Sequence, residues 1–346
     1  MRRKQLGLAL LSAALTLLLT GCFVKTVDEL YTLPRHSDEY DRLELAIDAV
    51  LSGQSAAYSA PVSGPNQQSV QLADLDGDGM DEAIAFLKAA GDKPLRACIF
   101  SHADGDYHLT DVIEGDGTSF ASVEYVQLTD RPGIELVIGW QLSTDVLQSL
   151  GAYSYADGHV SELMNANYSE YRVADLDGDG RKDIFILRFD AEQPQGVAEL
   201  YHWKDGQLER KPEAYLTAGA SQVKRILSGN LMKDVPAVFV ASAYENNSLV
   251  TDVFAFQDGT FRNVTAHEAE SAVSTVRSYY VYAADIDEDG LIELPQILPL
   301  PTAEGSDEND AAISWYNLDM EGRSLPKLTT YHSFSGGWFL KLPDSW

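Results

Sequence analysis

Closely spaced carboxylates recur at three places in the chain, with a spacing that suits a cation-binding loop. The clearest copy is Asp175-Leu-Asp-Gly-Asp-Gly-Arg-Lys-Asp183, which has carboxylates at loop positions 1, 3, 5 and 9. These oxygens and the carbonyl oxygen of position 7 can surround a hard cation, and the glycine at position 6 permits the sharp turn. Without a cation the four charges would repel one another. The spacing therefore predicts a Ca²⁺ site.

The same pattern begins again at Asp74 and at Asp285, so we expect about three Ca²⁺ ions. An EF-hand needs Glu at position 12, where this chain has Ile186, and each loop leads into an apolar run typical of a buried strand. We therefore expect loops that join strands. The predicted ligands are the side chains of Asp74, Asp76, Asp78, Glu82, Asp175, Asp177, Asp179, Asp183, Asp285, Asp287, Asp289 and Glu293, and the carbonyl oxygens of Met80, Arg181 and Leu291.

The loops belong to a longer repeat. Asp-Gly pairs, typical of hairpin turns, follow aromatic-rich segments at intervals of 53, 48 and 53 residues, beginning at Asp104, Asp157, Asp205 and Asp258, with Glu321-Gly322 as a weaker fifth. The loop register continues through residues 127–135 and 228–236, which lack the carboxylate pattern, and there we expect loops without metal. Five units of about four strands predict an all-β propeller of about five four-stranded blades.

The motif Asp-x-Asp-Gly-Asp-Gly-x-x-Asp before an apolar strand resembles the FG-GAP/VCBS repeat of integrin-α-type propellers, and the resemblance covers residues 69 to about 332. It implies a β-propeller whose acidic loops hold Ca²⁺ and which serves as a scaffold for binding partners. Many members of that family have seven blades, whereas five units are counted here. The strand before residue 69 or the tail at 336–343 is available to complete a blade.

Residues 1–21 are typical of a secretory signal peptide, with basic residues 2–4 before an apolar run at 6–19. The segment Leu-Thr-Gly-Cys22 resembles the lipobox of bacterial lipoproteins, in which the cysteine is acylated and begins the mature chain. We expect an exported protein of the bacterial cell envelope, held on the extracytoplasmic side of a membrane by lipid at Cys22. Acylation leaves Cys98 without a disulfide partner, so it is expected to be a small buried residue.

The remaining boundaries follow from composition. Residues 22–36 are expected to be a tether, and 37–68 a short N-terminal helix with a connecting segment. The helix is predicted from Ser37, as its cap, to about Leu51, and Gly53 is expected to end it. The propeller then occupies 69–346.

Charge and motifs limit the function. The net charge is −28, and no Lys/Arg cluster lies outside residues 2–4, which excludes nucleic-acid binding. Motifs of serine hydrolases, zinc proteases and phosphate-binding loops are missing from the sequence, so no enzyme is expected. We expect surface or structural roles for the histidines that lie beside the hairpins or in a short helix predicted between residues 264 and 277, which are His102, His108, His159, His202 and His267.

Three hypotheses stay open. The favoured one is a lipid-anchored binding module for a protein or glycan partner. The others are a propeller enzyme that acts on polysaccharide and a purely structural envelope lipoprotein. Clustered exposed aromatic residues would favour a glycan partner, and two carboxylates free of metal in a cleft would favour hydrolysis.

Overall fold

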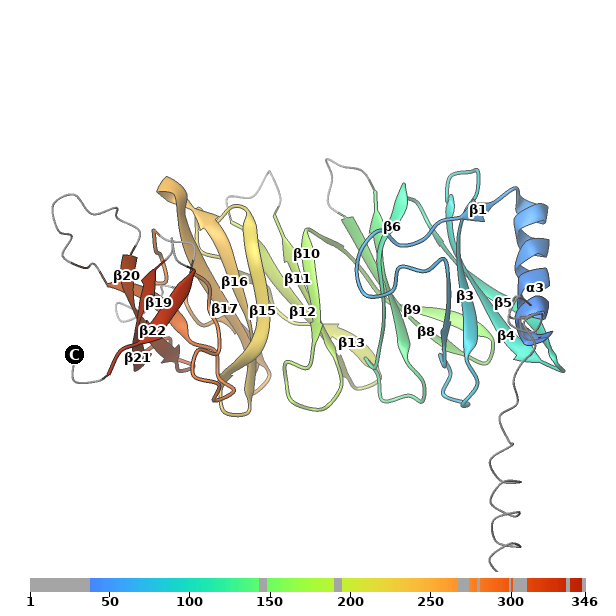
Figure 1. Cartoon of the computed structure of the whole chain (residues 1–346). Helices are drawn as coiled ribbons and strands as arrows, with labels where there is room; N and C mark the ends of the chain where they lie inside the picture. Colours follow the sequence, from blue (N-terminus) through green and yellow to red (C-terminus); the bar gives the residue numbers. More distant parts are fainter. Residues whose placement is uncertain are drawn as a thin grey trace, which may run out of the picture. The chain divides into compact units, whose positions relative to one another are not determined.

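Antiparallel strands build most of the chain in this computed structural model (Figure 1). The chain divides into two units, residues 1–45 and 46–346. The predicted signal peptide, the tether and Cys22 lie outside the described residues. No helix in the described part is both long enough and apolar enough to cross a bilayer. The structure describes residues 38–142, 148–189, 195–266, 274–278, 281–298, 300, 310–333 and 337–343.

The predicted N-terminal helix is present as α3 (Asp38–Gln54), with acidic residues in its first turn that suit the positive end of the helix dipole. Its predicted end at Gly53 is wrong, because the helix runs through this glycine. The helix ends where Ser55 takes a positive φ of 50°. The Ala56 N–H then donates to the Leu51 carbonyl oxygen at 3.1 Å, which closes the last turn.

The strands form five antiparallel sheets, numbered here along the chain, and in each sheet the strands mainly pair with their neighbours in sequence. Sheet 1 contains β1 (Ala57–Tyr58), β2 (Val70–Ala73), β3 (Glu82–Lys88), β4 (Leu95–Ala103) and β5 (Asp106–Gly115). Sheet 2 contains β6 (Ser119–Val126), β7 (Glu135–Gln141), β8 (Gln148–Ala156) and β9 (His159–Tyr168). Sheet 3 contains β10 (Glu170–Ala174), β11 (Asp183–Arg188), β12 (Val197–Lys204), β13 (Gln207–Arg210) and β14 (Ala214–Tyr215).

Sheet 4 contains β15 (Val223–Met232), β16 (Val235–Tyr244), β17 (Ser248–Gln257) and β18 (Thr260–Asn263), with the short 3₁₀ helix η1 (Glu245–Asn247) before β17. Sheet 5 contains β19 (Leu294–Leu298), β20 (Asp310–Leu318), β21 (Ser324–Ser333) and β22 (Trp338–Lys341). Five sheets with a four-stranded meander, preceded in sequence by one helix, confirm the predicted fold class.

The Asp-Gly pairs form the predicted hairpin turns. They connect β4 to β5, β8 to β9, β12 to β13 and β17 to β18. In each pair both residues have positive φ, for example 55° at Asp104 and 88° at Gly105. A two-residue turn of type I′ requires this backbone at both central positions, and Asp and Gly tolerate it best. The repeated pair therefore fixes the register of the last two strands in four sheets.

Two segments differ from the sequence interpretation. Residues 228–236 do not form a loop, because β15 and β16 continue their pairing to Met232 and Val235 and turn at Lys233-Asp234. In sheet 5, the described residues directly before the acidic loop, 281–284, contribute only an isolated bridge from Ala284 to Glu293. Here β22, within the predicted completing tail, supplies the fourth strand by pairing with β21.

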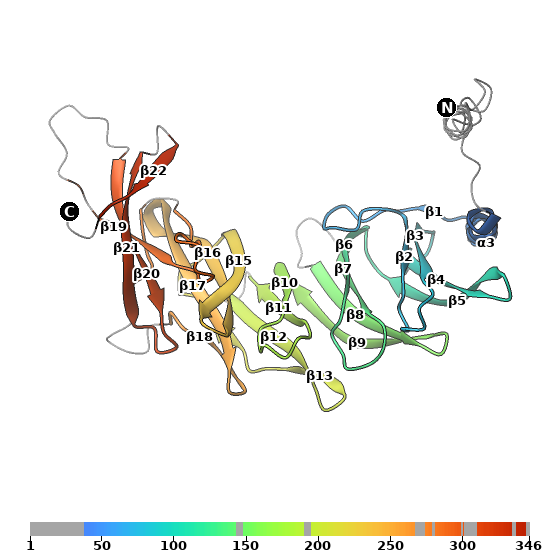
Figure 2. The same ribbon diagram turned by 60° about the horizontal axis from the view of Figure 1, so that its bottom comes forward.

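The core joins sheets that are consecutive in the chain. Phe86 of β3 packs edge-on against Phe120 of β6, with ring centroids 5.0 Å apart, and joins sheets 1 and 2. Phe185 of β11 and Phe254 of β17 join sheets 3 and 4, with tilted rings whose centroids are 5.4 Å apart. Sheets 2 and 3, and sheets 4 and 5, share two further clusters. Figure 2 shows consecutive sheets side by side. Among the described residues, no core cluster joins sheet 1 to sheet 5. Cys98 is a buried free thiol, as predicted.

Candidate metal-binding loops

Each acidic loop lies directly before the second strand of its repeat unit. Residues 74–82 connect β2 to β3, residues 175–183 connect β10 to β11, and residues 285–293 lead into β19. In each loop, the carboxylates of positions 1, 3 and 5 each offer an oxygen, and these oxygens lie within 4.8 Å of one another. The structure therefore brings together nine of the predicted ligands as three trios, which are Asp74, Asp76 and Asp78; Asp175, Asp177 and Asp179; and Asp285, Asp287 and Asp289.

Backbone amides hold the position 1 carboxylate of each trio. In the first loop, Asp74 accepts hydrogen bonds from the N–H groups of Gly77 at 2.8 Å and Gly79 at 3.1 Å. Asp175 accepts the equivalent bonds from Gly178 at 2.7 Å and Gly180 at 3.0 Å. These bonds fold the loop around its own carboxylates before any cation binds, so little further ordering is required.

The trios attract positive charge. Lys327 approaches Asp287 at 3.5 Å and also pairs with Asp289. In the second loop, Arg181 pairs with Asp179. Within the described residues, one buried oxygen of Asp287, Oδ1, has no hydrogen-bond partner. Ca²⁺ takes oxygen ligands, and each loop offers three converging carboxylates, so the residues fit the predicted ion.

The position 9 carboxylates are buried and do not belong to the three trios, although Asp183 offers an oxygen within 4.8 Å of one from Asp177. Glu82 accepts the N–H of Leu75 at 3.0 Å, and Asp183 accepts the N–H of Leu176 at 2.7 Å. In the loop at 127–135, which has no trio, Glu135 accepts the N–H of Leu128 at 2.7 Å. Position 9 therefore braces the loop with or without a metal. That Glu82, Asp183 and Glu293 are also ligands stays a prediction.

The position 7 residues turn their amides toward the trio. The N–H groups of Met80, Arg181 and Leu291 donate to the position 5 carboxylates at 2.7, 2.8 and 2.9 Å. These bonds complete the turn around the carboxylate of position 5. The predicted role of the three carbonyl oxygens as ligands stays a prediction.

The loops also contact the preceding sheet. The N–H of Lys182 donates to the carbonyl oxygen of Gln127 at 2.7 Å, and the N–H of Ile292 donates to that of Asn230 at 2.9 Å. Between sheets 1 and 2 the backbones come so close that a Cβ added at Gly133 would lie 2.2 Å from the Leu75 carbonyl oxygen. A cation that stiffens one loop therefore also stiffens the junction between two sheets.

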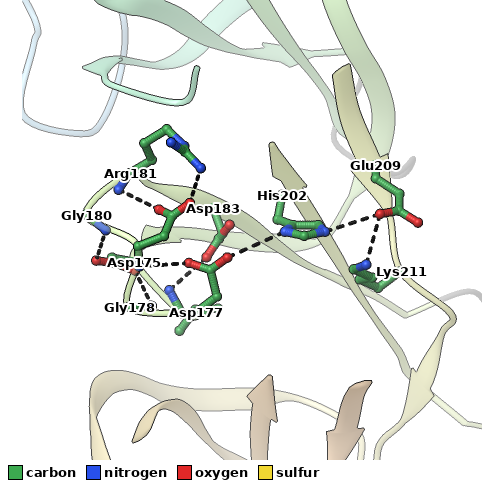
Figure 3. A network of polar contacts seen from close by, with 11 residues as sticks. Asp175, Asp177, Gly178, Gly180, Arg181, Asp183, His202, Glu209 and Lys211 are labelled. Carbon is green, nitrogen blue, oxygen red and sulfur yellow. Dashed lines mark hydrogen bonds and ion pairs between the residues drawn. The ribbon is translucent and has the colours of Figure 1, made fainter. Parts of the chain in front are cut away.

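Each acidic loop leads into a strand, and the next strand in the sequence carries a residue that stands level with the position 9 carboxylate. The register places Ser101 opposite Glu82, His202 opposite Asp183, and Asn317 opposite Glu293, one step beyond the last paired residues. Asn317 donates to Glu293 at 2.7 Å. His202 is 6% exposed and lies beside the second trio (Figure 3). The sequence analysis assigned His202 only a surface or structural role, although aligning the repeats on their Asp-Gly turns places it at this position.

Without a cation, protons compete for the buried carboxylates. Burial, reinforced by the charges of the three trio aspartates, raises the pKa of Asp183 from 3.8 to about 7. The same causes raise the pKa of Glu82 from 4.5 to about 7. Burial also raises the pKa of Glu293. Each of these groups takes up a proton more readily in the folded chain than in the unfolded chain.

These shifts predict the pH dependence of the metal-free protein. Raised carboxyl pKa values favour the protonated folded state, so their stabilising contribution is complete below about pH 4 and is lost as pH rises to about 7. We expect the melting temperature of chelator-dialysed protein to fall across this range. The melting temperature of Asp183→Asn should fall less steeply. Bound Ca²⁺ favours the ionised groups and should remove the fall. A melting temperature of wild type that falls no more steeply than that of Asp183→Asn would contradict the prediction.

Comparisons with known proteins give weak likenesses. No family model and no curated protein match the chain. Among solved structures it is similar to the exotype rhamnogalacturonan lyase YesX, with 14% identity over 79% of this chain and 57% of that chain and a TM-score of 0.28. The rhamnogalacturonan lyase PL11 of Bacillus licheniformis has 12% identity over 83% of this chain and 65% of that chain, with a TM-score of 0.35.

A third similar structure is TolB from Acinetobacter baumannii, with 9% identity over 84% of this chain and 69% of that chain and a TM-score of 0.25. The chain spans 57% and 65% of the lengths of the two lyases. We infer the five blades from the strand pairing described above.

Proposed function

We propose that this chain is a non-enzymatic binding module of the bacterial cell envelope, anchored by lipid at Cys22 and stabilised by Ca²⁺ in its three acidic loops. The observation that carries the proposal is the convergence of three carboxylates in each loop, at the same place in three repeat units. The loop contacts with the preceding sheets support a stabilising role for the ion. Carboxylates engaged with a cation are unavailable as an acid and base pair.

A pocket of about 730 Å³ supports a glycan partner. It lies among β14, β18 and the β20–β21 turn, and its lining includes Tyr215, Tyr244, Arg262 and Glu321. Tyr215 is 49% exposed and offers an aromatic face on which a sugar ring can stack. A concave site with aromatic and polar groups fits a sugar unit better than it fits the flat surface of a protein partner.

The proposed function is tested by retention of envelope polysaccharides on the immobilised mature protein, with and without Ca²⁺. We expect polysaccharide to be retained in Ca²⁺ and lost after chelation, because the sheets that build the pocket loosen. If only envelope proteins were retained, the partner would be a protein and not a glycan. Release of shortened, chemically cleaved polysaccharide would contradict a non-enzymatic module.

The anchor is tested separately at Cys22. We expect labelled fatty acid to enter the wild-type protein in its native host, and Cys22→Ala to abolish labelling and release the protein from the membrane fraction. Cys98→Ala is the control, because this thiol is buried in sheet 1 and should not affect labelling. Unlabelled wild-type protein would show that the lipobox resemblance is misleading.

A further inference from the structure

The acidic loop of sheet 3 differs from the other two by one buried histidine. His202 of β12 stands where sheet 1 has Ser101 and sheet 5 has Asn317. Its side chain is more than nine-tenths buried and points at the loop from another strand (Figure 3). Both nitrogens of a buried imidazole need a partner, so their surroundings show what the ring binds.

The outer nitrogen of His202 is already engaged. Nε2 lies 3.3 Å from Oε2 of Glu209, and Nζ of Lys211 lies 2.9 Å from the same oxygen. The ammonium group of Lys211 donates to this carboxylate, and an ionised carboxylate only accepts hydrogen bonds, so Nε2 carries the ring proton. The lone pair of the neutral ring is then on Nδ1. A carboxylate behind a histidine orients metal-ligating rings in the same way.

The inner nitrogen faces the loop without a hydrogen bond. Nδ1 of His202 has no hydrogen-bond partner among the described residues and lies 3.6 Å from Oδ2 of Asp177. Ligand atoms of His202, Asp177 and Asp183 all lie within 4.8 Å of one another, so a single ion can contact all three. The ring is held in place by Phe256, whose centroid is 5.1 Å away.

The nitrogen changes which metal the loop prefers. Ca²⁺ takes oxygen ligands, whereas imidazole together with carboxylates suits first-row transition metals such as Zn²⁺ and Mn²⁺. We propose that the loop of sheet 3 binds a transition-metal dication through Asp177, Asp183 and His202. The inference deepens the metal-binding role proposed above for Asp177 and Asp183, and adds a third ligand and a metal class. The loops of sheets 1 and 5 have only oxygen or amide side chains at these positions and keep the preference for Ca²⁺.

The site is accessible to an ion. A pocket of about 310 Å³ borders Asp177 and also includes Asp234 and Asp258 in its lining. Its carboxylates lie on the turns of sheet 4, next to the loop of sheet 3. A negatively charged pocket of this size attracts a hydrated dication and brings it to Asp177, the exposed member of the three proposed ligands.

The test is titration of the mature protein with Zn²⁺, and in a second arm with Mn²⁺, in an excess of Ca²⁺. We expect one transition-metal ion per chain that Ca²⁺ does not displace. His202→Asn, which gives sheet 3 the side chain found in sheet 5, should weaken this binding by at least about tenfold. Substitution with Co²⁺ should give a visible absorption band that is lost in His202→Asn and kept in wild type.

Two comparisons make the result decisive. His159→Asn is the matched control, because His159 also lies near a carboxylate, 3.8 Å from Asp111, but its side chain is 80% exposed. It should leave Zn²⁺ binding unchanged. A melting temperature of His202→Asn that still rises with Ca²⁺ shows that the variant is folded. Wild-type affinity in His202→Asn, or complete displacement of Zn²⁺ by Ca²⁺, would overturn the inference and leave calcium binding intact. Absence of binding by every metal would overturn both.

Discussion

Removal of Ca²⁺ is expected to lower the melting temperature of the protein by on the order of 10 °C. Extracellular sites of this ligand type have Kd values of about 10⁻⁴ to 10⁻³ M. At roughly 1 mM free Ca²⁺ and a Kd near 0.1 mM, mass action stabilises the folded state by about 1.4 kcal/mol per site. Three sites then contribute on the order of 4 kcal/mol, a large share of the roughly 5–15 kcal/mol that separates folded from unfolded chains.

With Ca²⁺ as the only metal present, Asp177→Ala should remove one of the three calcium ions and about a third of this stabilisation, because it removes one carboxylate of the second trio. Asp130→Ala is the control, since Asp130 is exposed in the loop that has no trio. Calorimetry gives the stoichiometry, and thermal unfolding with and without chelator gives the stabilisation. Wild-type protein that produces no binding heat at millimolar Ca²⁺ would leave the acidic loops as solvated turns.

Glu135→Ala is expected to cost about 3 kcal/mol or more of the free energy of unfolding, with or without Ca²⁺. Glu135 is 2% exposed. It accepts the N–H groups of Leu128 at 2.7 Å and Thr129 at 3.2 Å, and the hydroxyl group of Thr129 at 2.5 Å. Alanine would leave three buried donors without an acceptor, each costing roughly 1–3 kcal/mol unless water reaches it.

Denaturant unfolding of Glu135→Ala in Ca²⁺ and in chelator measures this cost. Glu162→Ala is the control, because Glu162 is exposed on β9 of the same sheet and should change the free energy of unfolding by less than about 0.5 kcal/mol. A cost that disappears after chelation would make Glu135 a metal ligand. An unchanged free energy of unfolding would show that the hydrogen bonds accepted by Glu135 do not stabilise the fold.

Features that depend on local sequence could be predicted. The Asp-Gly turns require positive φ at both residues, and the acidic loops follow a strict spacing, so both were placed correctly. The helix end was misplaced because Gly53 can remain helical while Ser55 adopts the left-handed backbone. The segment at 228–236 was misplaced because continued strand pairing, a non-local effect, replaced the loop.

The candidate site shows the same limit. The trio depends on residues within five positions, whereas His202 reaches Asp177 through the pairing of β11 with β12. The carboxylate at position 9 is predicted to bind the metal and also braces the loop by hydrogen bonds. The brace depends on the burial of this carboxylate, which the spacing does not reveal. Glu135 keeps the brace in a loop that has lost its trio, so the carboxylate alone does not indicate a metal.

The order of the core clusters bears on how the chain matures. Each cluster that spans two sheets joins sheets consecutive in sequence, so most stabilising contacts form between segments synthesised one after the other. Short loop closures and nearest-neighbour packing allow folding to proceed unit by unit. If the chain, exported as proposed here, crosses the membrane unfolded, it can complete each sheet against the one before it while later residues are still crossing. Calcium, abundant only outside the cell, would then secure each junction as it emerges.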